Sequence, residues 1–276
     1  MSFSWKRRYT GPVKAVIFDL AGTLVDYGSC APAGAFVELF RREGVPVTDA
    51  EAREPMGLQK KEHIRALGRM PSVAAGWEQA RGAAIAEADI DRLYETFIPL
   101  QVEILPEFCT LIPGALPAVR ELEGRGIRIA ATTGYNREMM DTVLREAAAQ
   151  GFTPEAAVCS DDVPQGRPAP WMLTRAMEAL GVYPPEASVA VGDTLPDIEA
   201  GLNAGVWTVG LTLTGNMLGL SAAEAAALPP EEKRRRLLRA GAEMAAAGAH
   251  YTIESTGDLP TVIDDINRRL ARGERP

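Results

Sequence analysis

The ten residues 18–27, FDLAGTLVDY, constrain the fold more than any other stretch of this chain. The segment 13–18 (VKAVIF) is short, apolar and rich in β-branched residues, which is typical of a buried parallel strand. Asp19 follows at once, which predicts a carboxylate at the carboxyl edge of a sheet, where open α/β sheets bind ligands. Gly22 allows the chain to turn sharply there.

Composition excludes several classes of protein. The net charge of −8 over 276 residues argues against nucleic-acid binding and against a membrane surface as partner. No apolar run approaches the ~18 residues of a transmembrane helix, and no signal sequence is visible, so we expect a cytoplasmic protein. Two histidines do not suggest a multi-histidine metal site. Three cysteines are expected to be free thiols in a reducing compartment: Cys30, Cys109 and Cys159.

A long helical block interrupts the chain after the first strand. Pro55 suits the first position of a helix that runs through Leu67. The block predicts an inserted helical cap at 28–106 and a core made of 1–27 and 107–276, with hinges at Gly28 and 106–113. Helices are predicted at 33–43, 50–54, 55–67, 73–87 and 89–105.

Strands and helices alternate with short connections from Gly114 onward, which favours a Rossmann-like, doubly wound parallel sheet of the α/β class. The Ala-rich segment 222–247 is predicted to be helical, with the basic run 233–236 on a solvated face. Its role is open. The predicted helices are 116–125, 136–150, 170–180, 196–203 and 259–272; the strands are 127–133, 156–159, 188–192, 206–211 and, at an edge, 250–253.

Polar groups follow four of the predicted strands, and parallel strand ends converge on one edge of a sheet. Carboxylates there would bind Mg²⁺, while a hydroxyl, a backbone N–H and a guanidinium would hold a phosphoryl group. Asp19 could act as a nucleophile, because a carboxylate can form an acyl phosphate. Singly, each residue also fits a plain turn or helix start; together they favour a site. They are Asp19, Thr133, Gly134, Arg167, Asp193 and Asp197.

This constellation resembles the haloacid dehalogenase superfamily of phosphotransferases. The resemblance implies that Asp19 is both nucleophile and ligand of one Mg²⁺, with Asp193 and the carbonyl of Ala21 as further ligands and Asp197 beside them. Most phosphatases of this superfamily carry an acidic residue where this chain has Ala21. Because alanine cannot donate a proton, either the chain is not an ordinary phosphomonoesterase or its leaving group needs no acid.

The predicted cap helix supplies an amine. Met56, Lys60 and His63 are spaced three or four apart, so they are expected to share one helix face. A desolvated lysine can attack a carbonyl to form a Schiff base, and a nearby histidine can move a proton. The chain has five lysines against twenty-four arginines, which slightly favours a special role for Lys60 over that of a surface lysine.

Together these features resemble the phosphonoacetaldehyde hydrolase family, over about residues 13–256. The resemblance implies P–C bond cleavage through a Lys60 Schiff base and an Asp19 aspartyl phosphate, a pocket shaped by Met56 and Tyr135, and a homodimer formed through the cap. The family position after Gly28 is often Cys and is Ser29 here. The matching stretches are 19–28, 55–63, 132–141, 161–172 and 191–194.

Two other functions stay open at this stage. A Mg²⁺-dependent phosphatase or phosphomutase of the same superfamily would turn over a small phosphate ester without Lys60. A catalytically silent binding protein on the same fold would perform no acyl-phosphate chemistry, and the intact set of Asp19, Thr133, Arg167 and Asp193 weighs against it.

Overall fold

The computed structural model describes residues 9–276 and shows one parallel six-stranded sheet in the order β3-β2-β1-β4-β5-β6. This confirms the predicted doubly wound α/β fold. The central strand β1 is buried along its whole length and pairs with β2 and β4. The strands are β1 Ala15–Asp19, β2 Arg128–Thr133, β3 Ala156–Cys159, β4 Ser188–Gly192, β5 Trp207–Leu211 and β6 Tyr251–Ile253.

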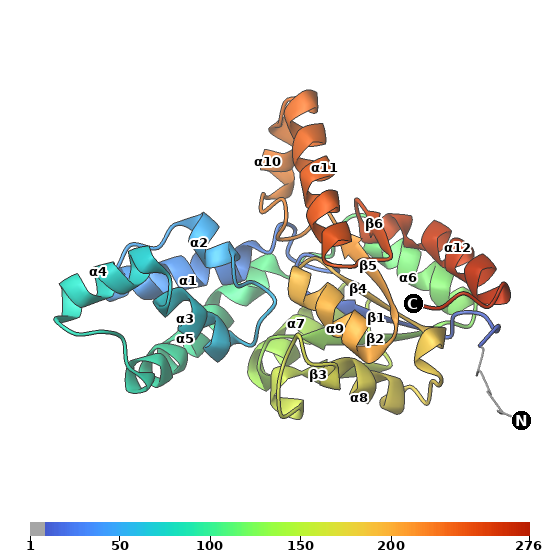
Figure 1. Cartoon of the computed structure of the whole chain (residues 1–276), viewed down its shortest axis with the longest axis horizontal. Helices are drawn as coiled ribbons and strands as arrows, with labels where there is room; N and C mark the ends of the chain where they lie inside the picture. The colour runs from blue at the N-terminus through green and yellow to red at the C-terminus, as the bar shows by residue number, and fades with distance from the viewer. Residues whose placement is uncertain (1–8) are drawn as a thin grey trace, which may run out of the picture.

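Both faces of the sheet are covered by helices, as Figure 1 shows. Alternate residues of β1 enter different cores: Val16 and Phe18 pack in the larger cluster, and Ala15 and Ile17 in the smaller one. Helices α6, α7 and α12 supply apolar residues to the larger cluster, and α8 and α9 to the smaller. Their bounds are α6 Ala115–Gly124, α7 Arg137–Ala149, α8 Trp171–Ala179, α9 Leu195–Ala204 and α12 Leu259–Ala271.

Five helices between β1 and α6 lie together to one side of the sheet (Figure 1) and form the expected cap. Aromatic rings hold them together: Phe36 stacks on Phe97 with centroids 4.4 Å apart, and Phe40 meets Trp77 edge-on. The division at 28 and 106 remains a prediction. The cap helices are α1 Cys30–Arg42, α2 Asp49–Arg53, α3 Lys60–Gly68, α4 Pro71–Arg81 and α5 Glu87–Phe108.

The prediction of one helix over 55–67 is wrong, because α3 begins only at Lys60. Residues 55–58 form turns, and Gly57 adopts φ +95°, outside the helical region. Met56 therefore precedes the helix that carries Lys60 and does not share its face. The predicted helix over 73–87 is also too long, since α4 ends where Gly82 takes a left-handed conformation.

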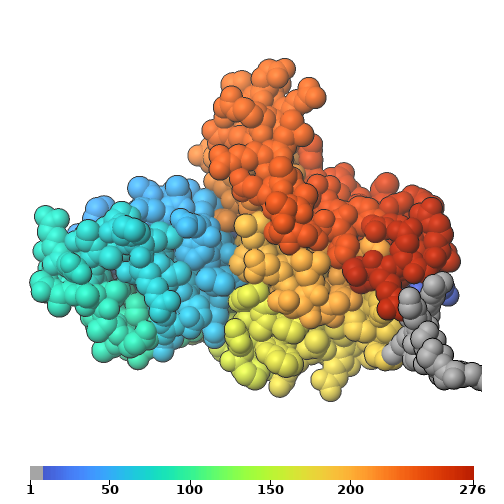
Figure 2. All heavy atoms as spheres, in the orientation of Figure 1, coloured from blue at the N-terminus to red at the C-terminus, as the bar shows by residue number. Residues whose placement is uncertain are grey.

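The Ala-rich segment is helical as expected and forms two helices, α10 Ala222–Ala227 and α11 Pro230–Ala246. Pro229 and Pro230 separate them, because proline cannot continue a helix hydrogen-bond ladder. The two helices project from the body of the molecule (Figure 2), and Arg234, Arg235 and Arg236 are exposed as predicted.

Two further expectations can be compared with the structure. The three cysteines are free. Within residues 9–276, no helix combines the length and the apolar character that crossing a bilayer requires.

Candidate active site

The predicted strand-end residues meet at one cavity between the core and the cap. Asp19 ends β1, Thr133 ends β2 and Asp193 directly follows β4. The cap contributes a turn and the start of α3 to the same cavity. Residues from both parts line it: Asp19, Ala21, Ser29, Met56, Lys60, Thr133, Gly134, Tyr135, Arg167 and Asp193.

Three buried aspartates form an acidic cluster. Asp19, Asp193 and Asp197 each place a carboxylate oxygen within 4.8 Å of the others. Burial raises the pKa of Asp19 to about 6, although Arg167 acts in the opposite direction. Burial and the charge of Asp19 raise the pKa of Asp193 well above its ordinary value. Because buried carboxylates are costly without a cation, this all-oxygen cluster fits a hard divalent metal ion.

Arg167 is held by three side chains. Its Nη2 donates to Asp19 Oδ1 at 2.6 Å and to Thr132 Oγ1 at 3.0 Å, and its Nε lies 2.9 Å from Asp197 Oδ1. Asp197 also accepts hydrogen bonds from the backbone N–H and the hydroxyl of Thr194. Asp197 therefore fixes Arg167 beside Asp19 as well as adding to the acidic cluster.

The end of β2 lies directly under the cap. Thr133 Oγ1 accepts a hydrogen bond from the Tyr135 N–H at 3.2 Å, which fixes the hydroxyl at the turn. A Cβ on Gly134 would lie 3.0 Å from the Leu58 carbonyl of the cap, so this position has no space for a larger side chain. The Tyr135 side chain is 2% exposed, and burial raises the pKa of its hydroxyl well above the usual value.

Lys60 is the first residue of α3 and is 5% exposed. Its Nζ lies 4.9 Å from the ring centroid of Tyr135 and 5.5 Å from that of Phe36. Burial lowers the pKa of Lys60 to about 8, partly offset by the negative charge of Asp19. A considerable fraction of this amine is therefore neutral near physiological pH, as a nucleophilic amine must be.

His63 is fully buried beside Phe36, one of the two aromatic rings near the Lys60 amine. Its ring stacks on Phe36 with centroids 3.7 Å apart, and its Nε2 donates to the Ala52 carbonyl at 2.9 Å. Burial and the nearby Lys60 charge hold the pKa of His63 well below its ordinary value. Among residues 9–276, Nδ1 finds no hydrogen-bond partner. His63 is thus a neutral imidazole one turn from Lys60, outside the cavity lining, and its role in proton transfer remains a prediction.

Sequence reasoning missed residues that orient the site. Ser29 Oγ donates to Asp193 Oδ2 at 2.9 Å, and the Asn216 N–H donates to the same oxygen at 2.7 Å. Thr132 faces Asp19 across the β1–β2 pair, so its place beside the strand end was a usable signal. No comparable pattern marks Asn216, which lies in an irregular loop after β5.

Comparison with known proteins identifies the family of this fold. Residues 13–205 match the family model described as haloacid dehalogenase-like hydrolase. That match covers the end of every strand that supplies a site residue. The chain thus belongs to the haloacid dehalogenase-like hydrolases.

More similar relatives define the family further. The chain is 47% identical over 276 residues to a phosphonoacetaldehyde hydrolase from Hahella chejuensis, covering 100% of this chain and 94% of that protein. It is 48% identical to another from Paraburkholderia xenovorans, covering 96% and 99%. The crystal structure of a phosphonoacetaldehyde hydrolase-like protein from Oleispira antarctica superposes with a TM-score of 0.98 at 44% identity, with full coverage of both chains. The chain belongs to the phosphonoacetaldehyde hydrolase family.

Proposed function

We propose that this chain hydrolyses the P–C bond of phosphonoacetaldehyde to acetaldehyde and phosphate, in the degradation of 2-aminoethylphosphonate. The observation that carries the proposal is the buried Lys60 amine, which lines the same cavity as the carboxylate of Asp19. Ala21, where superfamily phosphatases carry an acid, agrees with a leaving group that needs no proton at that point. The names of the relatives support the same substrate.

The acidic cluster would hold one Mg²⁺ per subunit, with Asp19, Asp193 and the carbonyl of Ala21 as protein ligands. The oxygen-only donor set and the raised pKa values of the two carboxylates support this assignment. When bound, the cation supplies charge neutralisation for the phosphoryl oxygens. The Thr133 hydroxyl, the Gly134 N–H and the Arg167 guanidinium bind the same oxygens and orient the phosphorus toward Asp19.

Lys60 allows the carbon atom that is bonded to phosphorus to act as a leaving group. Its neutral amine adds to the aldehyde carbon, and the hydroxyl of the adduct takes up one proton and departs as water, which leaves an iminium on Nζ. Asp19 then attacks phosphorus, and the electron pair of the P–C bond moves into the iminium to give an enamine. No proton is needed where Ala21 stands, because no oxyanion leaves. Met56 and Tyr135 exclude bulk water around the iminium.

Two hydrolyses complete the cycle. Water cleaves the aspartyl phosphate and restores the Asp19 carboxylate. The enamine takes up a proton on carbon, and water then releases acetaldehyde and frees the Lys60 amine. His63, one turn from Lys60, is our candidate for moving protons to and from the amine.

Borohydride trapping tests the Schiff base. The protein is incubated with phosphonoacetaldehyde and Mg²⁺, reduced, and mapped by mass spectrometry. We expect an adduct on Lys60 that disappears in Lys60→Arg together with acetaldehyde release. Lys61→Arg is the matched control, because Lys61 is the next residue but pairs with Asp91 at the surface. Absence of both the adduct and acetaldehyde release in the wild-type chain, with turnover of a small phosphate ester intact, would favour the phosphatase or phosphomutase alternative.

We also propose a homodimer formed through the cap, which rests on the family resemblance alone. Sedimentation velocity of the full chain should give a species of twice the 29.6 kDa chain mass. A monomer at micromolar concentrations would contradict it.

A further inference from the structure

Arg53, the last residue of α2, is well buried although the proposed reaction does not use it; its side chain is 12% exposed. Its Nε pairs with Asp49 Oδ2 one helical turn earlier, at 2.7 Å. The other side of the guanidinium faces the segment that connects β1 to α1: Nη1 donates to the Gly28 carbonyl at 2.6 Å and to the Ser29 carbonyl at 3.3 Å. A cap side chain therefore holds the segment through which the chain enters the cap.

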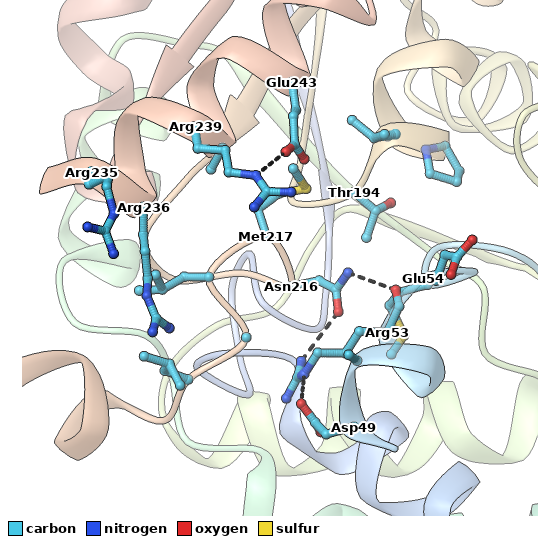
Figure 3. Close-up of a pocket in the computed structure, with 18 of the residues that line it drawn as sticks. Asp49, Arg53, Glu54, Thr194, Asn216, Met217, Arg235, Arg236, Arg239 and Glu243 are labelled. Atoms are coloured by element: carbon cyan, nitrogen blue, oxygen red, sulfur yellow. Dashed lines mark hydrogen bonds and ion pairs between the residues drawn. The ribbon is translucent and has the colours of Figure 1, made fainter. Parts of the chain in front are cut away.

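Arg53 also joins the cap to a distant loop of the core. Its Nη1 donates to Asn216 Oδ1 at 3.3 Å, and Asn216 Nδ2 donates back to the Arg53 carbonyl at 3.1 Å. Figure 3 shows the two side chains pointing toward each other across the groove between α2 and this loop. The reciprocal pair fixes both the position and the orientation of the loop against α2.

The segment 28–29 and the loop that carries Asn216, which both contact Arg53, also donate hydrogen bonds to Asp193. The Asn216 N–H and the Ser29 hydroxyl donate to one oxygen of that carboxylate, Oδ2. The loop lies so close that a Cβ on Gly215 would be 2.1 Å from the Asp193 Cβ. A shift of the loop or of the entry segment therefore moves Asp193, because the contact leaves no space for independent motion.

We propose that Arg53 is a positioning residue that couples the packing of the cap on the core to divalent-metal binding at Asp193. The inference rests on the proposed role of Asp193 as a metal ligand. Because coupling between two binding events is reciprocal, Mg²⁺ strengthens the contact between cap and core by the same factor by which that contact strengthens Mg²⁺ binding. The cap that carries Lys60 is thereby docked most firmly when the metal site is filled.

A double-mutant cycle on Mg²⁺ affinity tests the coupling. Calorimetric titration of Mg²⁺ into the full chain is expected to give binding about tenfold weaker in Arg53→Ala, the lower end of the effect of partners that orient metal ligands. Asn216→Ala should behave alike, although it keeps the backbone N–H that reaches Asp193. The double variant should again be about tenfold weaker and not a hundredfold, because the two residues act through one link.

Arg92→Ala is the matched control for removing a cap arginine. Arg92 makes a two-point contact with Glu43, at 2.8 and 3.0 Å, wholly within the cap. Its loss should leave the Mg²⁺ affinity unchanged. Equal weakening in Arg92→Ala would show a general effect of cap stability and overturn the proposal.

Hydrogen exchange gives a second readout that needs no turnover. Mg²⁺ should slow exchange of amides in α2 of the wild-type chain, and this protection should be lost in Asn216→Ala. If Arg53→Ala does not fold, Asn216→Ala alone decides the matter.

The variant Asp193→Asn distinguishes a failure of the proposed metal ligand from a failure of the proposed coupling. Wild-type Mg²⁺ affinity in Asp193→Asn would refute the proposed metal ligand. Weak binding in Asp193→Asn together with wild-type affinity in Arg53→Ala and Asn216→Ala would refute the coupling alone.

Discussion

Lys60 and Lys61 are neighbours in α3 but differ in every property that governs amine reactivity. Lys60 is buried against aromatic rings, and burial lowers its pKa to about 8, whereas Lys61 is partly exposed and paired with Asp91. Burial disfavours the ammonium ion, since water solvates charge better than aromatic rings do. The apolar surroundings on one side of α3 therefore lower the pKa of Lys60, as its proposed role as a nucleophile requires, while Lys61 remains a surface charge.

The pH dependence of adduct formation should report this difference. Lowering the pH below about 8 protonates Lys60, so the initial rate of borohydride-trapped adduct formation should fall about tenfold per pH unit well below that value and level off above it. Trapping at saturating Mg²⁺ from pH 6.5 to 9.5 measures the profile. A rate still rising tenfold per unit at pH 9.5 would contradict a lowered lysine pKa.

Arg167 should not be replaceable by lysine. Its planar guanidinium spans Asp19 and Asp197 at once, whereas an ammonium is a single point charge. We expect Arg167→Lys to reduce kcat by about 100-fold, comparable to the loss of one donor that stabilises transition-state charge. The rate of acetaldehyde release at saturating substrate measures kcat. Arg268→Lys, which changes an exposed pair with Asp265, is the control. Activity within threefold of wild type would show that positive charge alone suffices.

Residues at strand ends were predictable because their position follows from the strand itself. Asp19 ends a strand that is recognisable from its apolar run, and Thr133 ends a second strand of the same kind. Ser29 was not assigned to Asp193 because that contact joins residues 164 positions apart, in a segment with no periodic pattern. Such contacts depend on how loops pack, and a local pattern carries no information about that.

At the scale of elements, the turn 55–58 decides where the cap meets the core. Gly57 combines φ +95° with a close approach to the core, where a Cβ would lie 2.2 Å from Thr194 Oγ1. This conformation also keeps the helix from starting at Pro55, so α3 begins only at Lys60. Pro55 suggested the first position of one helix that carries both Met56 and Lys60, but the tertiary contact requires a left-handed glycine between them.

Gly57→Ala should therefore impair catalysis more than stability. The methyl group would displace the turn from Thr194, and the lysine that follows it would move away from Asp19. We expect kcat to fall at least tenfold, since small displacements of reacting groups are costly. Gly82→Ala is the control, because Gly82 has φ +75° with open space around its Cβ position. Equal losses in both variants would mean that backbone strain alone causes the effect.

At the scale of the whole molecule, the alternation of strands and helices predicted a parallel, doubly wound sheet. The strand order β3-β2-β1-β4-β5-β6 was not part of that prediction. The arrangement of the cap over the sheet was not specified in the same way. It depends on contacts such as that between Gly134 and the Leu58 carbonyl, which neither segment predicts alone. The Ala-rich segment 222–247 was expected to be helical, and its division into α10 and α11 falls at two prolines that are visible in the sequence.

The buried carboxyl groups of Asp19 and Asp193 govern how the stability of the whole molecule depends on metal and on pH. The pKa of Asp19 is raised from 3.8 to about 6, and that of Asp193 is raised well above 3.8. For a carboxyl whose pKa is higher in the folded state, the folded state binds more protons. Its contribution to stability is therefore full below the unfolded pKa and is lost as pH rises through the folded value.

Metal-free protein should thus gain the most from Mg²⁺ at high pH, where both carboxylates carry their charge. At pH 5 protons compete for the same oxygens, so the Mg²⁺-induced rise in Tm should be smaller than at pH 8. At pH 8 and 100-fold excess over Kd, binding adds about 2.7 kcal/mol to the free energy of unfolding. Calorimetric melting with Mg²⁺ or with chelator measures the difference. Asp193→Asn should abolish most of it, and an equal shift at both pH values would show that the ion binds elsewhere.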